Sequence, residues 1–177
     1  NIYTSFDQQK TLFSVLLDAS NNFGKQYEII EDIYRKPTNY RKIILQSILL
    51  SIYLKKQTNV SEYIGVMLPN SIALSVLFFA LQFIGRVPAM LNFTSGSFAI
   101  KRACQTAQIK TIYTSKAFIQ KAKLENPIKE LEKECKIFYL EDIKEKINLK
   151  SKISAFLIYL NVERYYNKQS IAKTPES

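Results

Sequence analysis

The residues best suited to bind a phosphate lie in one short segment, Phe93–Ser97, which reads FTSGS. A loop rich in Thr, Ser and Gly between a strand and a helix can present backbone N–H groups to a phosphate. No Gly-Lys-Ser/Thr follows it, so it is not a Walker loop, and its single glycine does not make a dinucleotide fingerprint. We therefore interpret the segment as a strand-to-helix connection in which Ser95 or Ser97 caps the helix.

Two pairs of adjacent carboxylates, Glu31–Asp32 and Glu141–Asp142, could act in acid–base chemistry. Each pair follows a strand-like segment, the place where α/β enzymes carry functional side chains. Adjacent carboxylates on one strand point to opposite faces, so the members of a pair cannot easily share a substrate. We interpret both pairs as solvated strand ends.

An aromatic pair, Tyr165–Tyr166, lies beside Arg164 and Lys168 near the end of the chain. Tyrosines next to basic residues can stack on nucleic-acid bases. At this position they are more typical of the packed end of a helix, and we expect no nucleic-acid partner.

The chain contains no histidine, which excludes Ser-His-Asp and Cys-His catalysis and every metal site ligated by histidine. Its two cysteines, Cys104 and Cys135, are far apart in sequence and form neither a disulfide framework nor a zinc site. They are predicted to be ordinary free thiols of a reducing compartment.

The net charge of +10 is concentrated in the second half, where residues 101–177 hold 16 basic and 9 acidic side chains. Such a half can face nucleic acid, an anionic bilayer or an acidic carrier protein. Between residues 132 and 152, however, lysines alternate with carboxylates, a mixture typical of solvated helix faces.

One apolar run, residues 63–85, carries no charge over 23 positions. Pro69-Asn70-Ser71 interrupts it with turn and helix-capping chemistry. The remaining piece, 71–84, is too short to cross a bilayer at 1.5 Å per residue. We predict a strand followed by a core helix, and no transmembrane span.

Strand-like and helix-like segments alternate along the whole chain. A helix capped by Thr11 runs to Phe23 and ends at Gly24, and a second begins at Thr38 or Asn39 and runs to Lys56. Strands are predicted at 27–33, 63–68, 87–91, 110–114 and 136–140, a turn at 35–38, helices at 71–84, 97–107, 115–124, 127–135 and 150–166, and a turn or short helix at 141–148. The pattern predicts an α/β fold: a mostly parallel twisted sheet, built from the last four strands, with helices on both faces.

Three segments in the middle of the chain carry a resemblance. Tyr63–Ser71 reads YIGVMLPNS, Phe79–Gln82 reads FALQ, and Gly85–Thr94 reads GRVPAMLNFT. Together they resemble the N-terminal region of adenylate-forming enzymes, the AMP-binding acyl-CoA synthetase and luciferase superfamily. In structural terms Asn70 or Ser71 caps a helix that Gly85 ends, and the Asn92 amide ties down the loop that follows its strand.

Further segments resemble one subgroup of that superfamily. ACQTAQIKT at Ala103–Thr111, TLF at Thr11–Phe13 and LLDA at Leu16–Ala19 look like the synthetase module of the bacterial bifunctional 2-acylglycerophosphoethanolamine acyltransferase / acyl-(acyl-carrier-protein) synthetase. The resemblance extends from Thr11 to Asp142. It implies an incomplete N-terminal subdomain of the acyl-CoA synthetase/luciferase-like fold at 11–166, with an N-terminal extension at 1–10 and a polar, frayed tail at 167–177.

The resemblance implies that the complete enzyme uses ATP and Mg to turn a fatty acid into an acyl-adenylate. The acyl group then passes to an acyl-carrier protein or CoA for phospholipid acylation. In that family ATP is held by a loop ending in Gly-x-Pro-Lys-Gly, by a downstream acidic residue and by a Lys of a C-terminal lid. Thr94–Ser97 is similar to the start of such a loop, but the sequence continues as Phe98-Ala99-Ile100. None of the three ATP-binding features is found in this chain. By order along the chain, we expect the loop after Ser177.

We therefore assign no catalytic, cofactor-binding or metal-binding residue to this chain and expect it to bind no cofactor and to be inactive alone. It lacks an initiator Met, so we expect a piece of a longer or processed product, cytoplasmic or held at the cytoplasmic face of the inner membrane by the rest of the parent protein. Its partners would be fatty acid, acyl-carrier protein and the missing remainder of the synthetase as a separate chain.

Two alternatives remain open from the sequence. One is a non-enzymatic α/β module that binds anionic lipid or acidic carrier protein through its basic second half. The other is an unrelated doubly wound nucleotide-binding protein. If helices 39–56 and 71–84 normally pack against a missing lobe, the isolated chain would expose apolar surface and aggregate.

Overall fold

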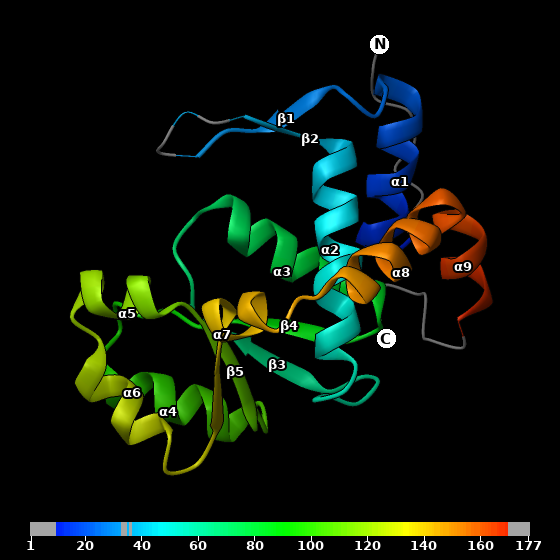
Figure 1. Cartoon of the computed structure of the whole chain (residues 1–177). Helices are drawn as coiled ribbons and strands as arrows, with labels where there is room; N and C mark the ends of the chain where they lie inside the picture. The colour runs from blue at the N-terminus through cyan, green and yellow to red at the C-terminus, as the bar shows by residue number, and fades with distance from the viewer. Residues whose placement is uncertain (1–9, 33–34, 36, 170–177) are drawn as a thin grey trace.

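The computed structural model describes residues 10–32, 35 and 37–169, so nearly all of the extension 1–10, residue 33 of the strand predicted at 27–33, residue 36 of the turn predicted at 35–38 and most of the tail 167–177 lie outside the described residues. Its elements follow the predicted alternation of strands and helices (Figure 1). They are α1 (Leu12–Phe23), β1 (Glu28–Ile30), β2 (Thr38–Asn39), α2 (Tyr40–Leu54), β3 (Tyr63–Val66), α3 (Ile72–Phe83), β4 (Val87–Met90), α4 (Ser97–Thr106), β5 (Thr111–Thr114), α5 (Lys116–Ala122), α6 (Glu125–Leu131), β6 (Lys136–Tyr139), α7 (Leu140–Glu145), α8 (Leu149–Leu160) and α9 (Val162–Lys168).

The central sheet has the spatial order β4-β3-β5-β6, and all three pairings are parallel. Its strands are the four that the sequence predicts for one sheet. Each successive strand is reached through at least one helix, as parallel pairing requires. The α/β class, the parallel sheet and its helices are therefore confirmed.

Helices cover both faces of this sheet, and each face has its own apolar core. The long-helix face is formed by α1, α2, α3, α8 and α9 against Ile64, Val66 and Tyr113. The short-helix face is formed by α4, α5 and α6 against Met67 and Ile112. Because side chains alternate across a strand, neighbouring positions of β5 serve different cores. Figure 1 shows the two groups of helices on opposite sides of the strands.

Gly65 allows the short-helix core to close on the sheet. A Cβ at this position would lie 2.9 Å from Ile112 Cγ1, 3.0 Å from Leu91 Cδ1 and 3.1 Å from Ile109 Cγ2. These distances are shorter than ordinary carbon contacts, so three core side chains occupy the space that any larger residue would need.

The two longest apolar helices, α2 and α3, pack against each other inside the long-helix face. Their predicted N-caps are confirmed: Asn39 Oδ1 accepts from Lys42 N at 2.9 Å, and Ser71 Oγ accepts from Leu74 N at 3.2 Å. Neither helix carries an exposed large apolar side chain. α1 packs against both helices and α8 packs against α2, and the aggregation of the isolated chain stays a prediction.

Residues 150–166 do not form the single helix predicted for them. The chain turns at Asn161, with φ −131° and ψ 40°, which separates α8 from α9. The turn brings Tyr166 into the core, where its ring centroid lies 5.1 Å from that of Phe13 and 5.8 Å from that of Phe83. A second difference is β2, which pairs antiparallel with β1 in a small ribbon that the sequence analysis missed.

A buried arginine joins α3 and β4 to the loop after α2. Arg86 Nε donates to Thr58 Oγ1 at 3.0 Å, and its other nitrogens donate to the carbonyl oxygens of Thr58 and Ile84. Burial lowers the pKa of the guanidinium, yet its partners here are neutral oxygens. We interpret Arg86 as a structural residue that holds the turn leading into β4.

The uncharged run 63–85 divides into β3 and α3, as predicted. Within the described part of the chain, no helix combines the length and the apolar character that crossing a bilayer demands.

Candidate functional site

The carboxyl edge of the sheet is the first place to look for a ligand site. In open α/β sheets, ligands bind where neighbouring strands send their connections in opposite directions. Here that point lies between β3 and β5, because β4 lies on one side of β3 and β5 lies on the other.

This edge is closed by hydrogen bonds within the chain. Thr114 Oγ1 donates to Met67 O at 2.7 Å, and Met67 N donates to Tyr113 O at 3.0 Å. The side chains of Met67 and Thr114 are both fully buried. The Thr114 hydroxyl and the backbone groups of Met67 therefore bind partners within the chain at the point between the two strands.

Glu141 occupies the N-terminal end of α5. Its carboxylate accepts hydrogen bonds from Ser115 Oγ at 2.7 Å, Lys116 N at 3.0 Å and Ala117 N at 3.2 Å. Burial raises the pKa of Glu141, but these hydrogen bonds outweigh it, so the pKa lies below its usual value. The end of a helix that favours anions is thus filled by a carboxylate of the protein itself.

The prediction that Glu141–Asp142 is a solvated strand end is therefore wrong. Both residues lie in the first turn of α7, and Asp142 forms an ion pair with Lys116. The sequence signal that identifies this arrangement is the Ser115 cap, which opens a helix whose N–H groups need acceptors. Glu31 and Asp32 follow β1, far from the parallel sheet in sequence, and are partly or fully exposed.

The loop between β4 and α4 has the predicted structural role. Asn92 Oδ1 accepts from Thr94 N at 3.0 Å and from Thr94 Oγ1 at 2.7 Å, which confirms that its amide ties down the loop. The predicted cap by Ser95 or Ser97 is wrong. Gly96 holds the N-cap position with φ +83° and makes no side-chain capping bond, while the Ser95 hydroxyl donates to Asn92 O at 2.7 Å.

The aromatic pair at the end of the chain is packed, as predicted. Tyr166 is buried, and its hydroxyl lies 2.8 Å from Thr11 Oγ1. The ring of Tyr165 stacks on Phe83 with a centroid distance of 5.8 Å. The pair therefore fastens α9 to α1 and α3.

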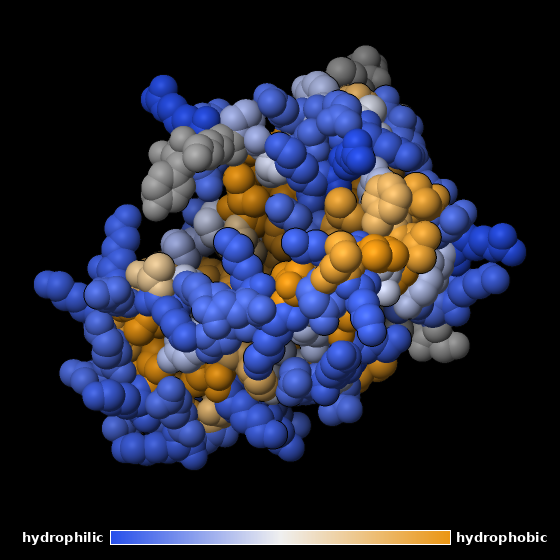
Figure 2. Space-filling model, in the orientation of Figure 1, coloured by the Kyte–Doolittle hydropathy of each residue, from blue (hydrophilic) through white to orange (hydrophobic). Residues whose placement is uncertain are grey.

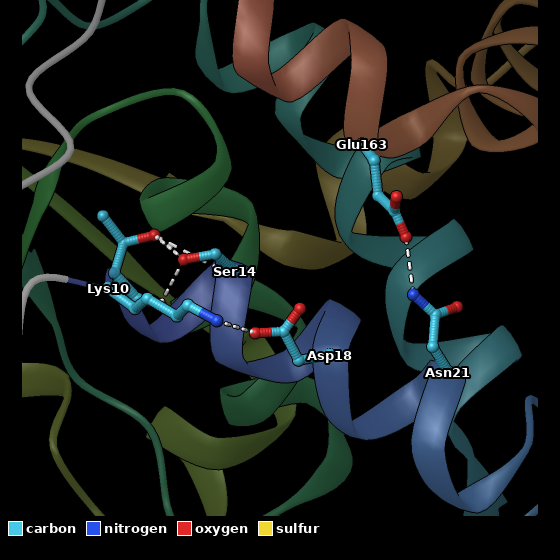
Figure 3. Close-up of polar contacts among 6 residues, drawn as sticks. Lys10, Ser14, Asp18, Asn21 and Glu163 are labelled. Carbon is cyan, nitrogen blue, oxygen red and sulfur yellow. Dashed lines mark hydrogen bonds and ion pairs between the residues drawn. The ribbon is translucent and has the colours of Figure 1, made fainter. Parts of the chain in front are cut away.

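A cleft of about 270 Å³ lies between α1, α2 and the corner of α8 and α9. Polar residues at its edge bridge the helices: Asn21 Nδ2 donates to Glu163 Oε1 at 2.6 Å (Figure 3). Lys25 Nζ lies 5.7 Å from the ring centroid of Tyr159, close enough for a cation–π contact. The Asn21–Glu163 and Lys25–Tyr159 contacts secure the C-terminal helices to α1 and the residues just after it. Figure 3 also shows Lys10, which precedes α1, paired with Asp18 of α1 at 2.8 Å.

The two cysteines are free and buried in the short-helix face, as predicted. Burial raises the pKa of Cys104 to about 12 and also raises that of Cys135. Neither thiol is available as a thiolate nucleophile near neutral pH. Across the described ranges, no group of three or more His, Cys, Asp or Glu residues is arranged to hold a metal ion.

In the described part of the second half, three lysines form ion pairs with carboxylates: Lys101, Lys116 and Lys133. Lys101 Nζ lies 2.6 Å from Glu134 Oε1, and Lys133 Nζ lies 2.7 Å from Glu130 Oε1. All four side chains remain partly exposed. These charges form a solvated face and not a continuous basic stripe.

No protein-family model matches the sequence. Solved structures do match the fold. VinN in complex with 3-methylaspartate superposes on 96% of this chain and on 43% of its own, with a TM-score of 0.67 at 16% sequence identity. The Klebsiella oxytoca NpsA N-terminal subdomain superposes on 60% of this chain and on 27% of its own, with a TM-score of 0.54 at 20% identity.

The chain therefore has the fold of the N-terminal subdomain of adenylate-forming enzymes. The same NpsA subdomain in complex with anthranilyl-AMSN matches 63% of this chain with a TM-score of 0.54. The chain spans less than half of the VinN chain and less than a third of the NpsA subdomain. The adenylate-forming fold is thus represented here by part of one subdomain.

Proposed function

We propose that this chain is the N-terminal part of an ATP-dependent fatty acyl-(acyl-carrier-protein) or acyl-CoA synthetase. The complete enzyme would activate fatty acids as acyl-adenylates for phospholipid acylation. The observation that carries the proposal is the superposition of 96% of the chain on VinN, together with the sequence resemblance between Thr11 and Asp142.

The geometry supports a scaffold role for this part of the enzyme. The motif residues that carry the resemblance have structural partners: Ser71 caps α3, Asn92 orders the loop after β4, and Gly65 permits close packing. The carboxyl edge between β3 and β5 is closed by the chain's own groups. ATP and Mg would be held by the phosphate loop and the lid, which belong to other parts of the family's sequence pattern.

We propose the partners and the cellular location on the same basis. The partners would be a fatty acid, an acyl-carrier protein and the rest of the synthetase, supplied in the same product or as a separate chain. The location would be cytoplasmic, at the inner membrane if the parent protein holds it there.

ATP–pyrophosphate exchange tests the proposal. Two proteins are compared: the chain as it exists, and a product extended in frame through a phosphate loop and lid. We expect exchange with palmitate only for the extended product. Strong exchange by the chain alone would contradict the scaffold role.

The choice of acid distinguishes the proposed adenylation activity from the proposed fatty acid substrate. Because VinN was solved with 3-methylaspartate and L-aspartate, and NpsA with anthranilyl-AMSN, aspartate and anthranilate are the matched alternative substrates. Exchange with either of these but not with palmitate would support adenylation and contradict the fatty acid as the substrate. No exchange with any of the three acids by a folded extended product would remove both.

A further inference from the structure

The outward side of α8 carries a continuous apolar stripe. Its members share one helical face, because they recur at intervals of three and four residues. They are Leu149, Ile153, Phe156, Leu157 and Leu160, with exposed fractions of 72, 52, 43, 60 and 57%. We call them the outer stripe. The opposite side of α8 contributes Ala155 and Tyr159 to the long-helix core.

Figure 2 shows this surface as an orange patch over α8 with hydrophilic residues around it. Other exposed large apolar side chains, such as Phe23, Val60 and Phe98, lie on separate elements. Single exposed apolar residues are normal on a folded protein, but a contiguous patch indicates a surface that another body covers.

Basic side chains border the outer stripe. At 100° per residue, Lys150 lies on one flank of the stripe and Lys152 lies on the other. Residues 146–162 contain three lysines and no carboxylate. Among the described residues, neither Lys150 nor Lys152 forms an ion pair, so both ammonium groups are available to an anionic surface.

The basic border continues past the end of α8. A hollow of about 380 Å³ adjoins the stripe and is lined by Leu157, Tyr165, Arg164 and Lys168, with Ile158 and Asn161 between them. A phosphate group could lie against its two cations while an attached chain follows the apolar residues. Glu163, a carboxylate of α9, accepts a hydrogen bond from Asn21.

The positive charge of the side chains that border the outer stripe favours an anionic bilayer over a second copy of the chain. A second copy related by two-fold symmetry would bring the same patch against itself, and lysines would face lysines and Arg164. An anionic bilayer offers acyl chains for the stripe and phosphates for its border. An apolar stripe flanked by lysines is the arrangement of helices that lie in the plane of a membrane surface.

We propose that the outer stripe of α8 lies on the surface of an anionic phospholipid bilayer. The apolar side chains enter the boundary between headgroups and acyl chains, and Lys150 and Lys152 contact phosphates on either side. This surface is independent of the proposed catalytic function, so either proposal can fail alone.

Co-sedimentation of the whole chain with vesicles tests the proposal. We expect binding to vesicles of phosphatidylglycerol and phosphatidylcholine in equal parts, weaker binding at high salt, and little binding to phosphatidylcholine alone. Because the chain has no tryptophan, the variant Phe156→Trp places a single indole in the stripe. Its emission should shift to shorter wavelength when the anionic vesicles bind.

Paired variants assign the effect to α8. Lys150→Gln with Lys152→Gln should lower the partition coefficient about thirtyfold, from about 1 kcal/mol for each basic residue at an anionic surface. Leu157→Ser should lower it about tenfold through lost apolar burial. The matched controls, Lys121→Gln with Lys129→Gln and Phe98→Ser, remove like groups from the short-helix side and should leave binding unchanged.

Three results would overturn the proposal: no binding to anionic vesicles, equal binding to neutral and anionic vesicles, or equal losses in the control variants. A fourth is self-association in sedimentation velocity that Leu157→Ser abolishes while vesicle binding persists, because a second copy would then cover the stripe. Circular dichroism melting of each variant confirms that it is folded, which the exposure of the substituted side chains favours.

Discussion

The helices on the two faces of the sheet each bury an apolar core, but they present different side chains to solvent. On the short-helix face, charged side chains pair across neighbouring elements, as in the contacts of Lys101 with Glu134 and of Glu141 with α5. On the long-helix face, the outermost helix presents apolar side chains to solvent and lysines without ion-pair partners. The two surfaces differ most in their exposed apolar side chains, which gather in one stripe on α8 and are scattered on the short-helix side.

The difference indicates where the chain meets other molecules. A surface whose exposed large apolar side chains are scattered singly gains little from a partner. A surface that leaves an apolar stripe in water gains free energy when it is covered. Interaction is therefore expected on the long-helix side of this subdomain, away from the closed carboxyl edge of the sheet.

The largest expected effect breaks the long-helix core. Phe83 is 2% exposed, and its ring contacts those of Phe13, Tyr165 and Tyr166. Phe83→Ala should lower the free energy of unfolding by about 4 kcal/mol, because it leaves a cavity and releases α9 from α1. Urea denaturation followed by circular dichroism measures the change.

The matched substitution on the other face is Phe118→Ala. Phe118 is only partly buried and makes an edge contact with Phe93, with centroids 4.9 Å apart. Its loss should cost about 1.5 kcal/mol. Equal losses for the two variants would contradict the expectation that the cost follows the burial of the ring.

A smaller effect concerns Glu141, whose carboxylate caps α5. Glu141→Gln should reduce the free energy of unfolding by about 1 kcal/mol at pH 7, the usual size of a helix cap, since solvent screens this half-buried site. The control Glu132→Gln removes an exposed carboxylate without such contacts and should change stability less.

The effect of Glu141 should depend on pH in one direction. Its pKa is lower in the folded protein than in the unfolded chain, so its stabilisation is present above the unfolded value of about 4.3 and is lost as pH falls through the folded value. Unfolding curves of wild type and Glu141→Gln should therefore converge near pH 3. A difference that grows as the pH falls would exclude the ionised carboxylate as the stabilising group.

The smallest expected effect is that of a surface ion pair. Lys133→Gln removes the partner of Glu130, and both side chains are more than half exposed. Because solvent screens such a pair, the melting temperature should stay within experimental error. A clear fall in melting temperature would mean that the short-helix face depends on its charges more than its packing suggests.

Local chemistry made most of the fold predictable. Helix starts at Thr11, Ser71 and Ser115 follow from side chains that accept hydrogen bonds from N–H groups three residues ahead. The parallel sheet follows from apolar strands separated by helices. Information of this kind is contained in a few neighbouring residues, so the sequence alone is sufficient to find it.

Most of the errors depend on contacts between distant segments, whereas the misplaced cap of α4, at Gly96, is local. The turn at Asn161 exists because Tyr166 must reach Phe13 and Phe83, and the exposure of α8 depends on which helices cover α2 and α3. The role of Glu141 depends on a helix that begins 25 residues earlier in the chain. No pattern within a short window reveals these partners, which explains why the elements were predictable and the surface chemistry was not.

The burial of Cys104 and Cys135 has a practical consequence. Both thiols lie in one core, and each must become accessible before an alkylating reagent can modify it. The rate of alkylation therefore measures how often α4 and α6 open away from β5, independently of events around α8. The wild-type sequence thus contains its own reporter of local opening, confined to one half of the molecule.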